Sequence, residues 1–118
     1  MSFYISLALA KLLYRCGCKL ILASRNISQL ERVKNELVNE AKITSQIYYD
    51  PVIIALDLSD LSDIQIKAAK ALEFYGEIDI LINNAGISYR GSIVETNIQV
   101  DQKLMLINYF GQVAMTKG

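Results

Sequence analysis

Apolar and polar positions alternate with two different periods along the 118 residues of the chain. In four stretches an apolar side chain recurs every three or four positions, which predicts helices over residues 5–15, 27–41, 62–75 and 98–117. Between them lie three short runs that are apolar at nearly every position, residues 19–24, 52–56 and 78–82. Such runs are typical of strands with both faces buried, so the pattern predicts a parallel sheet with helices on both sides.

Several helix ends have local signals. Ser28 and Glu31 have the spacing of a capping box at the start of the second helix. Asp60 or Ser59 is placed to cap the third helix, and Gly76 follows its last turn, where glycine is a common stop. These signals agree with the periodicity on where the helices begin and end.

Composition excludes several classes of protein. Twelve Lys and Arg residues balance twelve Asp and Glu residues, so no net field attracts nucleic acid or an anionic membrane. The chain has no histidine, which excludes Ser-His-Asp hydrolysis and removes the commonest metal ligand. Cys16 and Cys18 alone build neither a disulfide framework nor a zinc site, so we expect reduced thiols and no metal.

The apolar residues near the N-terminus, FYISLALA, could be mistaken for a targeting signal. Lys11 and Arg15 interrupt the run well short of the ~20 apolar residues that a membrane span needs, and no basic segment precedes it. We therefore expect a helix there, no membrane span in this chain, and a cytoplasmic location.

Polar residues directly follow each predicted strand. In open parallel sheets, ligands bind beyond the carboxyl ends of the strands. That rule selects Ser24-Arg25, Asp57-Leu58 and the segment Asn83-Asn84-Ala85-Gly86 as the places where a ligand is expected.

Four sequence blocks carry a family resemblance: LILASRN, ALDLSD, DILINNAGIS and LINYFGQVAMTKG. In this order and spacing they resemble the short-chain dehydrogenase/reductase family, most closely its dehydrogenase/reductase member 7 type, over nearly the whole chain from Leu7 onward. The resemblance implies an α/β fold, a partial Rossmann-like three-layer sheet that contains the second, third and fourth strands of the family. Residues 1–118 then form an incomplete dinucleotide-binding domain, without the first strand and the C-terminal half.

The resemblance assigns an NADP(H) cofactor to the first two places. Arg25, next to Ser24, matches the basic residue that meets the 2′-phosphate of NADP, and a guanidinium forks well onto phosphate. The alternative is a solvated arginine at a helix entrance. Asp57 matches the acid that binds the adenine amino group, with Leu58 beside the ring. A turn residue is the alternative for Asp57, and the two roles are compatible.

The resemblance also assigns roles to the third place and to the last helix. Asn84, Ala85 and Gly86 match the segment against which the adenosine ribose packs, where small residues let the backbone approach a ligand. A tight turn would explain the glycine but not two adjacent asparagines. Asn108 matches the helical asparagine that supports a water and a lysine in the proton relay.

Two family motifs are absent from the 118 residues. No Gly-x-Gly occurs, and in register the last two glycines of the family's phosphate-binding turn fall on Tyr4 and Ser6. None of the seven tyrosines is followed by a lysine four residues later, and the family's catalytic serine has no counterpart either. The sequence therefore predicts weak cofactor binding and no catalysis.

Two function classes stay open at this point. One is a fragment or short isoform of an NADP-dependent oxidoreductase acting on carbonyl or alcohol substrates, inactive as it stands. The other is a non-catalytic module that pairs with a full-length homologous subunit through the last helix. The resemblance also allows an association with the endoplasmic reticulum. For the segment DILIN, residues 79–83, we expect burial, with Asp79 nearest to solvent, and we expect either an unfilled gap in the sheet or pairing of 80–82 with 20–23.

Overall fold

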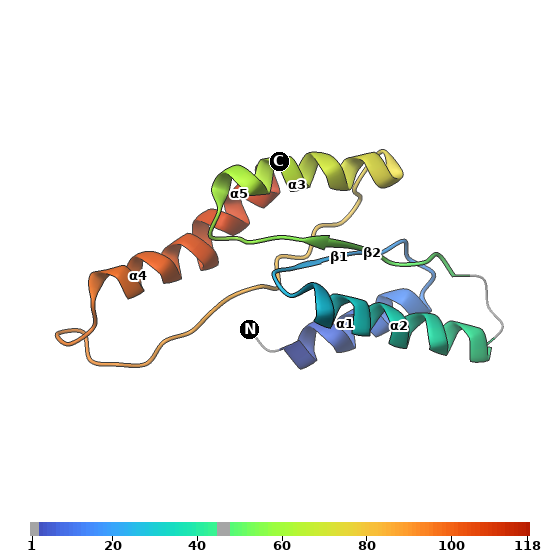
Figure 1. The fold of residues 1–118 in the computed structure, drawn as a ribbon, viewed down its shortest axis with the longest axis horizontal. Helices are drawn as coiled ribbons and strands as arrows, with labels where there is room; N and C mark the ends of the chain where they lie inside the picture. Colours follow the sequence, from blue (N-terminus) through green and yellow to red (C-terminus); the bar gives the residue numbers. More distant parts are fainter. Residues whose placement is uncertain (1–2, 45–47) are drawn as a thin grey trace. The chain divides into compact units, whose positions relative to one another are not determined.

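The computed structural model describes residues 3–44 and 48–118 (Figure 1). Its elements are, in chain order, α1 (Phe3–Arg15), β1 (Ile21–Ser24), α2 (Ile27–Thr44), β2 (Val52–Ala55), α3 (Leu61–Tyr75), α4 (Ile98–Met105), a π-helical segment (Leu106–Gly111) and α5 (Gln112–Lys117). These residues divide into two compact units, the first ending at Ala55 and the second beginning at Leu56. Each unit has its own architecture.

The first unit is built on a parallel strand pair. β1 and β2 pair in register from Ile21 with Val52 to Ser24 with Ala55, and the Val52 N–H donates to the Leu20 carbonyl at 3.0 Å. Parallel strands need a crossover between them, and α2 supplies it. The predicted α/β class, with two strands at the expected places in the chain, is confirmed.

The core of this unit forms where α1 and α2 meet the strand pair. It is made of Ala10, Tyr14, Leu20, Val33 and Leu37. Leu37 is fully buried, and the ring of Tyr14 stacks on that of Tyr48 with 4.9 Å between centroids. Burial raises the pKa of the Tyr14 phenol, and the nearby Asp50 and Tyr48 raise it further, so Tyr14 acts as a neutral core aromatic.

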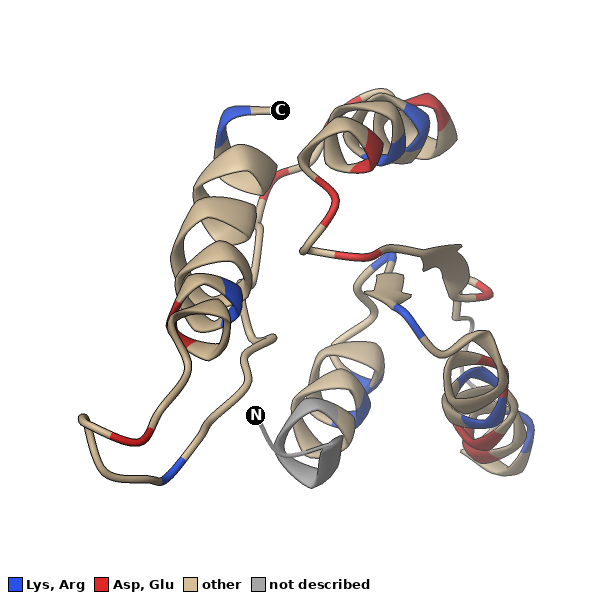
Figure 2. Ribbon diagram, turned by 60° about the vertical axis from the view of Figure 1, so that its left-hand side comes forward, with Lys and Arg blue, Asp and Glu red and all other residues tan. Residues whose placement is uncertain are grey.

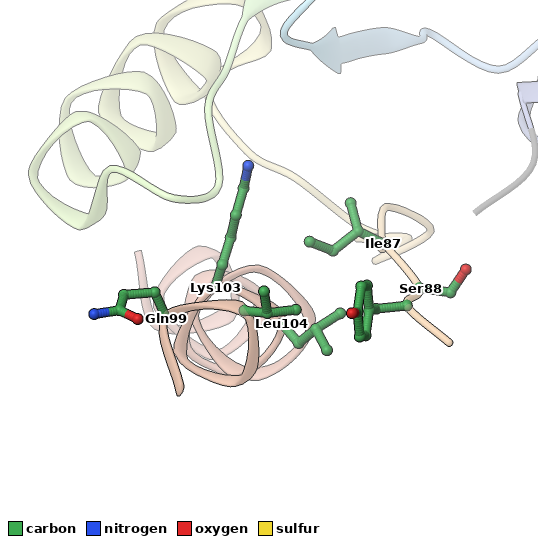
Figure 3. Close-up of a pocket in the computed structure, with 7 residues that line it drawn as sticks. Ile87, Ser88, Gln99, Lys103 and Leu104 are labelled. Carbon is green, nitrogen blue, oxygen red and sulfur yellow. The ribbon is translucent and has the colours of Figure 1, made fainter. Parts of the chain in front are cut away.

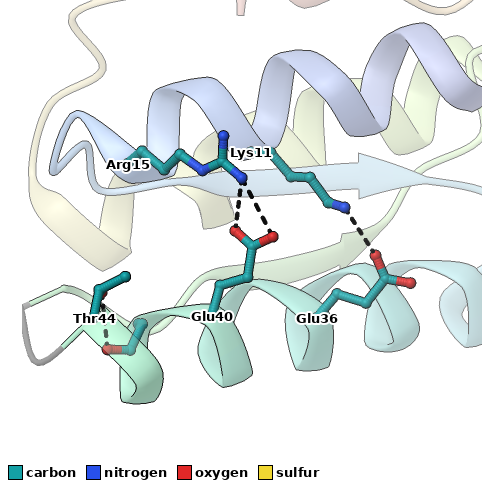
Figure 4. A network of polar contacts seen from close by, with 6 residues as sticks. Lys11, Arg15, Glu36, Glu40 and Thr44 are labelled. Carbon is teal, nitrogen blue, oxygen red and sulfur yellow. Dashed lines mark hydrogen bonds and ion pairs between the residues drawn. The ribbon is translucent and has the colours of Figure 1, made fainter.

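Two ion pairs link α1 to α2 (Figure 4). Lys11 Nζ lies 3.6 Å from Glu36 Oε2, and Arg15 Nη2 lies 3.4 Å from both carboxylate oxygens of Glu40. The second pair lies four residues, about one helical turn, further along both helices than the first, so α1 and α2 run in the same direction. The pairs are partly exposed and contribute about 0–1 kcal/mol each, so the apolar core dominates the packing.

The start of α2 differs from the predicted capping box. The helix begins at Ile27, and Asn26 caps it, because its Oδ1 accepts a hydrogen bond from the Gln29 N–H at 3.2 Å. Ser28 therefore lies inside the first turn, and the prediction that it forms a capping box with Glu31 is wrong. Asparagine ranks with serine as a cap, so the sequence contained a competing signal two residues earlier.

The second unit begins with the predicted cap of α3. Asp60 accepts hydrogen bonds from the Ser62 hydroxyl at 2.7 Å and the Asp63 N–H at 3.1 Å, and these two bonds lower the pKa of its carboxyl. Gly76 ends the helix with a φ of 79°, a left-handed conformation that favours glycine. Both predicted ends of α3 are confirmed.

The last predicted helix is also present, as one continuous run. Asn97 caps α4 by accepting from the Gln99 N–H at 3.0 Å, and the helical backbone continues through the π-helical segment into α5. A π turn holds one residue more than an α turn, and such turns are frequent at functional sites. Asn108 and Gly111 both lie in this segment.

The prediction of a third strand at residues 78–82 is wrong. The sheet of the described residues contains β1 and β2 alone, so of the two alternatives for 80–82 the pairing with 20–23 does not form. The expected burial of residues 79–83 is wrong too, because all five are exposed, Ile80 to 74%. A strand needs a neighbour for its N–H and C=O groups, and an apolar sequence alone does not supply one. Separately, no helix within residues 3–44 and 48–118 is long and apolar enough to cross a membrane.

Removing the Leu37 side chain should test the core of the first unit. Leu37→Ala is expected to lower the free energy of unfolding by about 2–5 kcal/mol, because it leaves a cavity among fully packed neighbours. Ile43→Ala on the same helix is the matched control, since Ile43 is 82% exposed and its loss should cost less than about 0.5 kcal/mol. Urea unfolding followed by circular dichroism measures both, and equal costs would contradict this core.

Candidate functional site

The end of β1 presents a basic side chain to solvent. Ser24 Oγ accepts a hydrogen bond from the Asn26 N–H at 3.1 Å, which turns the chain directly into α2. Arg25, between them, is exposed, and among the described residues no acidic side chain forms an ion pair with it. Residues 2–55 contain seven Lys and Arg residues against four Asp and Glu residues, so the surrounding charge favours an anion.

The residues after β2 form a tight turn. Asp57 is half-buried, and its Oδ1 accepts from the Ser59 N–H at 2.9 Å and from the Ser59 hydroxyl at 2.6 Å. The Asp60 N–H donates to the Asp57 carbonyl at 3.1 Å. The turn role that the sequence allowed for Asp57 is therefore observed, and it sets the direction in which Leu58 leaves the strand end.

Asn108 binds the backbone of the loop that follows residue 86. Its Oδ1 accepts from the Ile87 N–H at 2.8 Å and its Nδ2 donates to the Ile87 carbonyl at 2.7 Å. One side-chain amide thus satisfies both backbone groups of one residue, as a neighbouring strand would. Gly86 lies directly beside this contact, since a methyl group built on it would be 3.4 Å from Asn108 Oδ1. The structure therefore brings together two of the predicted site residues, Gly86 and Asn108.

Two further side chains of the last helix contact the same loop. Gln112 Nε2 donates to the Ala85 carbonyl at 2.6 Å. Thr116 Oγ1 accepts from Asn83 Nδ2 at 3.1 Å and donates to the Gln112 carbonyl at 2.9 Å. Neither Gln112 nor Thr116 was among the residues predicted from the sequence. Their spacing from Asn108, four and eight residues along one helix face, is the signal that could have identified them.

The same helix also packs closely on the turn after β2. Gly111 is buried, and a methyl group built on it would collide with the Leu58 carbonyl oxygen and lie 3.0 Å from the Leu58 Cβ. Only glycine leaves room for this approach. Leu58 and the loop 83–87 are thus both fixed against the π-helical segment and α5, which places two of the predicted ligand-binding segments on one helix.

Two hollows open on the second unit. The larger, of about 370 Å³, is lined by Ile87, Ser88, Tyr89, Gln99, Val100, Lys103 and Leu104. In Figure 3 the Ser88 hydroxyl points away from Leu104, and Ile87, Val100 and Leu104 supply the apolar part of the lining. It contains none of the predicted cofactor residues. The smaller, of about 280 Å³, lies along the face of Asn108, Gln112 and Thr116. The hydrogen-bonded loop, and not the larger hollow, is therefore the better guide to the site.

The chemistry available around the loop is binding rather than proton transfer. The side chains that meet it are those of Asn83, Asn108, Gln112 and Thr116, whose amides and hydroxyl stay neutral and do not titrate near neutral pH. What they supply is a fixed backbone with small residues at Ala85 and Gly86. Such an arrangement suits close approach of a flat or sugar-like ligand surface.

Parallel strands joined by a helical crossover, with a polar segment after each strand, are the features of a Rossmann-like α/β fold. The sequence model of one such family, described as short chain dehydrogenase, matches residues 4–118. The chain therefore belongs to the short-chain dehydrogenase family.

Relatives narrow the comparison. A protein of Anopheles gambiae named "Dehydrogenase/reductase SDR family protein 7-like" is 48% identical over 112 residues, which are 94% of this chain and 34% of that protein. The mouse "Dehydrogenase/reductase SDR family member 7B" is 44% identical over 109 residues, which are 92% of this chain and 33% of the mouse protein. The chain thus spans about a third of the length of the curated relatives it matches.

Solved structures agree on the fold. An alcohol dehydrogenase from Thermococcus sibiricus, complexed with 5-hydroxy-NADP, superposes with a TM-score of 0.83 at 26% identity, over 93% of this chain and 44% of that chain. A metagenomic short-chain oxidoreductase in complex with NADP gives a TM-score of 0.85 at 24% identity, over 96% of this chain and 48% of that chain, and supports the fold alone. The partial Rossmann-like fold predicted from the sequence is thereby confirmed.

Gly111→Ala tests the close contact between the last helix and Leu58. Alanine is the better helix former by about 1 kcal/mol, so an unconstrained position would gain stability. Here we expect a loss of stability, because the new methyl group would collide with the Leu58 carbonyl, and a backbone group cannot move aside as a side chain can. Thermal unfolding followed by circular dichroism measures the sign. Gln102→Ala on the exposed face of α4 is the control, and a stabilised Gly111→Ala variant would contradict the contact.

Proposed function

We propose that this chain carries the nucleotide-binding part of an NADP-dependent short-chain oxidoreductase that acts on carbonyl or alcohol substrates. The observation that carries the proposal is the pair of hydrogen bonds between Asn108 and Ile87, which fixes the backbone directly after Gly86. Membership of the family supports it, and so does a relative of known structure at 26% identity that was solved with a modified NADP.

Each predicted residue has a defined task in this proposal. The Arg25 guanidinium binds the 2′-phosphate, with Ser24 shaping the turn beside it. Asp57 accepts a hydrogen bond from the adenine amino group, and Leu58 packs on the ring. Those four residues hold the adenosine end of the cofactor.

The remaining residues support the ribose and the reaction centre. Asn84, Ala85 and Gly86 pack against the adenosine ribose, where the lack of large side chains lets the backbone come close. Asn108 holds the loop through its side chain, and in a complete proton relay it would support a water and a lysine. Of these residues, Asn108 alone belongs to the catalytic machinery of the family.

Binding by this chain alone should be weak. Charge-assisted hydrogen bonds contribute about 1.5–3 kcal/mol each, so the absence of two or three at the pyrophosphate removes ~3–9 kcal/mol. A micromolar complex corresponds to only about 8 kcal/mol. We therefore expect dissociation constants in the millimolar range for NADP(H).

The 118-residue polypeptide by itself should not reduce carbonyl compounds. No tyrosine in it is followed by a lysine four residues later, so the acid that protonates the substrate oxygen has no counterpart. Purified protein mixed with NADPH and a panel of ketones and aldehydes should consume no NADPH above the protein-free blank. Turnover at rates usual for an enzyme would contradict this prediction.

Arg25 should set the preference between the two nicotinamide cofactors. Adenosine 2′,5′-bisphosphate is expected to bind about tenfold more tightly than adenosine 5′-monophosphate, because the guanidinium meets the extra phosphate, and Arg25→Ala should abolish the difference. Titration followed by amide NMR shifts reaches the millimolar range. Arg90→Ala removes the same charge from the second unit and should keep the preference. Equal affinities in the unmodified chain would contradict the assignment.

A second candidate function is pairing with a full-length homologous subunit through the last helix. Large apolar side chains lie exposed along it: Ile98, Met105, Tyr109 and Phe110 are each at least 50% exposed. Ile98, Met105 and Tyr109 are seven and four residues apart and so share one face, and Phe110 packs edge-on against Tyr109 at 5.2 Å. Figure 2 shows few charged residues on this helix. An apolar face of this kind is typical of an interaction surface.

Co-purification tests this second function. The chain is expected to co-purify with a tagged full-length relative, such as the one from Anopheles gambiae, and Tyr109→Lys should lower the recovered amount at least tenfold by placing a charge in the apolar face. Ile66→Lys, at an exposed apolar position of α3, is the control and should leave recovery unchanged. Equal recovery of both variants would contradict pairing through this helix.

A further inference from the structure

A regular series of contacts joins the loop to the last helix, beyond the single asparagine. Asn83 contacts Thr116, Ala85 contacts Gln112, and Ile87 contacts Asn108. The loop residues advance by two while the helix residues step back by four. The two segments therefore run in opposite directions with matched contacts at every step.

Simple geometry explains why the steps match. Two residues of extended chain span about 6.6 Å, and four residues of α-helix span about 6.0 Å. The two periods differ by about 0.6 Å for each step, or about 1.2 Å over the three contacts, and the side chains absorb this difference together with the tighter rise of the π-helical segment between Asn108 and Gln112. A helix face with polar residues at positions 108, 112 and 116 can thus hold every second residue of an extended loop.

We propose that Gln112 and Thr116 are positioning residues, which fix Asn84, Ala85 and Gly86 for the cofactor. Asn84 lies between the two residues held by Thr116 and Gln112, and Gly86 lies between those held by Gln112 and Asn108. Two of the three contacts reach the loop backbone, at Ala85 and Ile87, and the third holds the side chain of Asn83. Their role in cofactor binding rests on the function proposed above, whereas the hydrogen bonds are observed directly.

The chemistry of each position is specific. Gln112 must donate, because its partner is a carbonyl oxygen, and a carboxylate of the same shape would place negative charge against that oxygen. Thr116 must both accept and donate, because its hydroxyl accepts a hydrogen bond from the Asn83 amide and donates one to the Gln112 carbonyl. A hydroxyl meets both demands, and an isosteric methyl group meets neither.

Amide hydrogen exchange of the unmodified chain and its variants, followed by NMR, tests this assignment. In Gln112→Glu and in Thr116→Val the amides of Asn84 and Ile87 should exchange at least tenfold faster, while the amides of α3 and the thermal unfolding midpoint stay unchanged. Thr116→Ser keeps the hydroxyl and should restore the slow rates. Gln102→Glu makes the same substitution on the exposed face of α4 and should have no effect.

Two results would overturn the assignment. One is unchanged exchange at Asn84 and Ile87 in both variants. The other is a uniform increase over α4, α5 and the loop together with a lower unfolding midpoint, which would show that the two side chains merely stabilise the helix. NADP⁺ titration of the unmodified chain is a separate measurement: absence of binding contradicts the proposed function, whereas the exchange rates alone decide the positioning role.

Discussion

The peptide groups of a long segment without helix or strand need hydrogen-bond partners, and this requirement governs the second unit. Within residues 78–97 a few peptide groups bond to one another, as the Asn84 N–H does to the Ile82 carbonyl at 3.1 Å, and other partners come from side chains. Asn108 meets Ile87 with an amide that has the same donor and acceptor as a peptide, and Gln112 meets the carbonyl of Ala85. These two side-chain amides therefore restrain the conformation of the loop.

The two units differ in the kind of surface that each presents at its predicted ligand-binding segments. The first unit offers charge, because Arg25 stands exposed at the end of β1 in a surface with excess basic residues. The second offers shape, because its loop and the turn at Leu58 are held by neutral side chains and by the space at Gly111.

Much of the fold could be predicted from the sequence, because helices and their caps depend on neighbouring residues. As expected, Asp60 caps the start of α3 and Gly76 ends it. The apolar run up to Ser24 forms a strand that pairs in parallel. The run at residues 78–82 is as apolar but forms no strand, since a strand also depends on partners far away in the chain. Gln112 and Thr116 were missed for a related reason: their partners are 27 and 33 residues distant, and one of those partners is a backbone atom with no sequence signature.

Because of the π-helical segment at 106–111, the loop contacts depend on the number of residues in the last helix as well as on their identity. Its extra residue rotates everything after Gly111 by about 100° relative to an uninterrupted helix. A single-residue deletion there would keep the composition, the helix content and every hydrogen-bonding side chain of α5, yet turn Gln112 and Thr116 away from the loop. A comparison of homologous sequences should therefore begin with the number of residues between Asn108 and Thr116. With a different number, the same side chains would point in other directions around the helix axis and could not contact the loop.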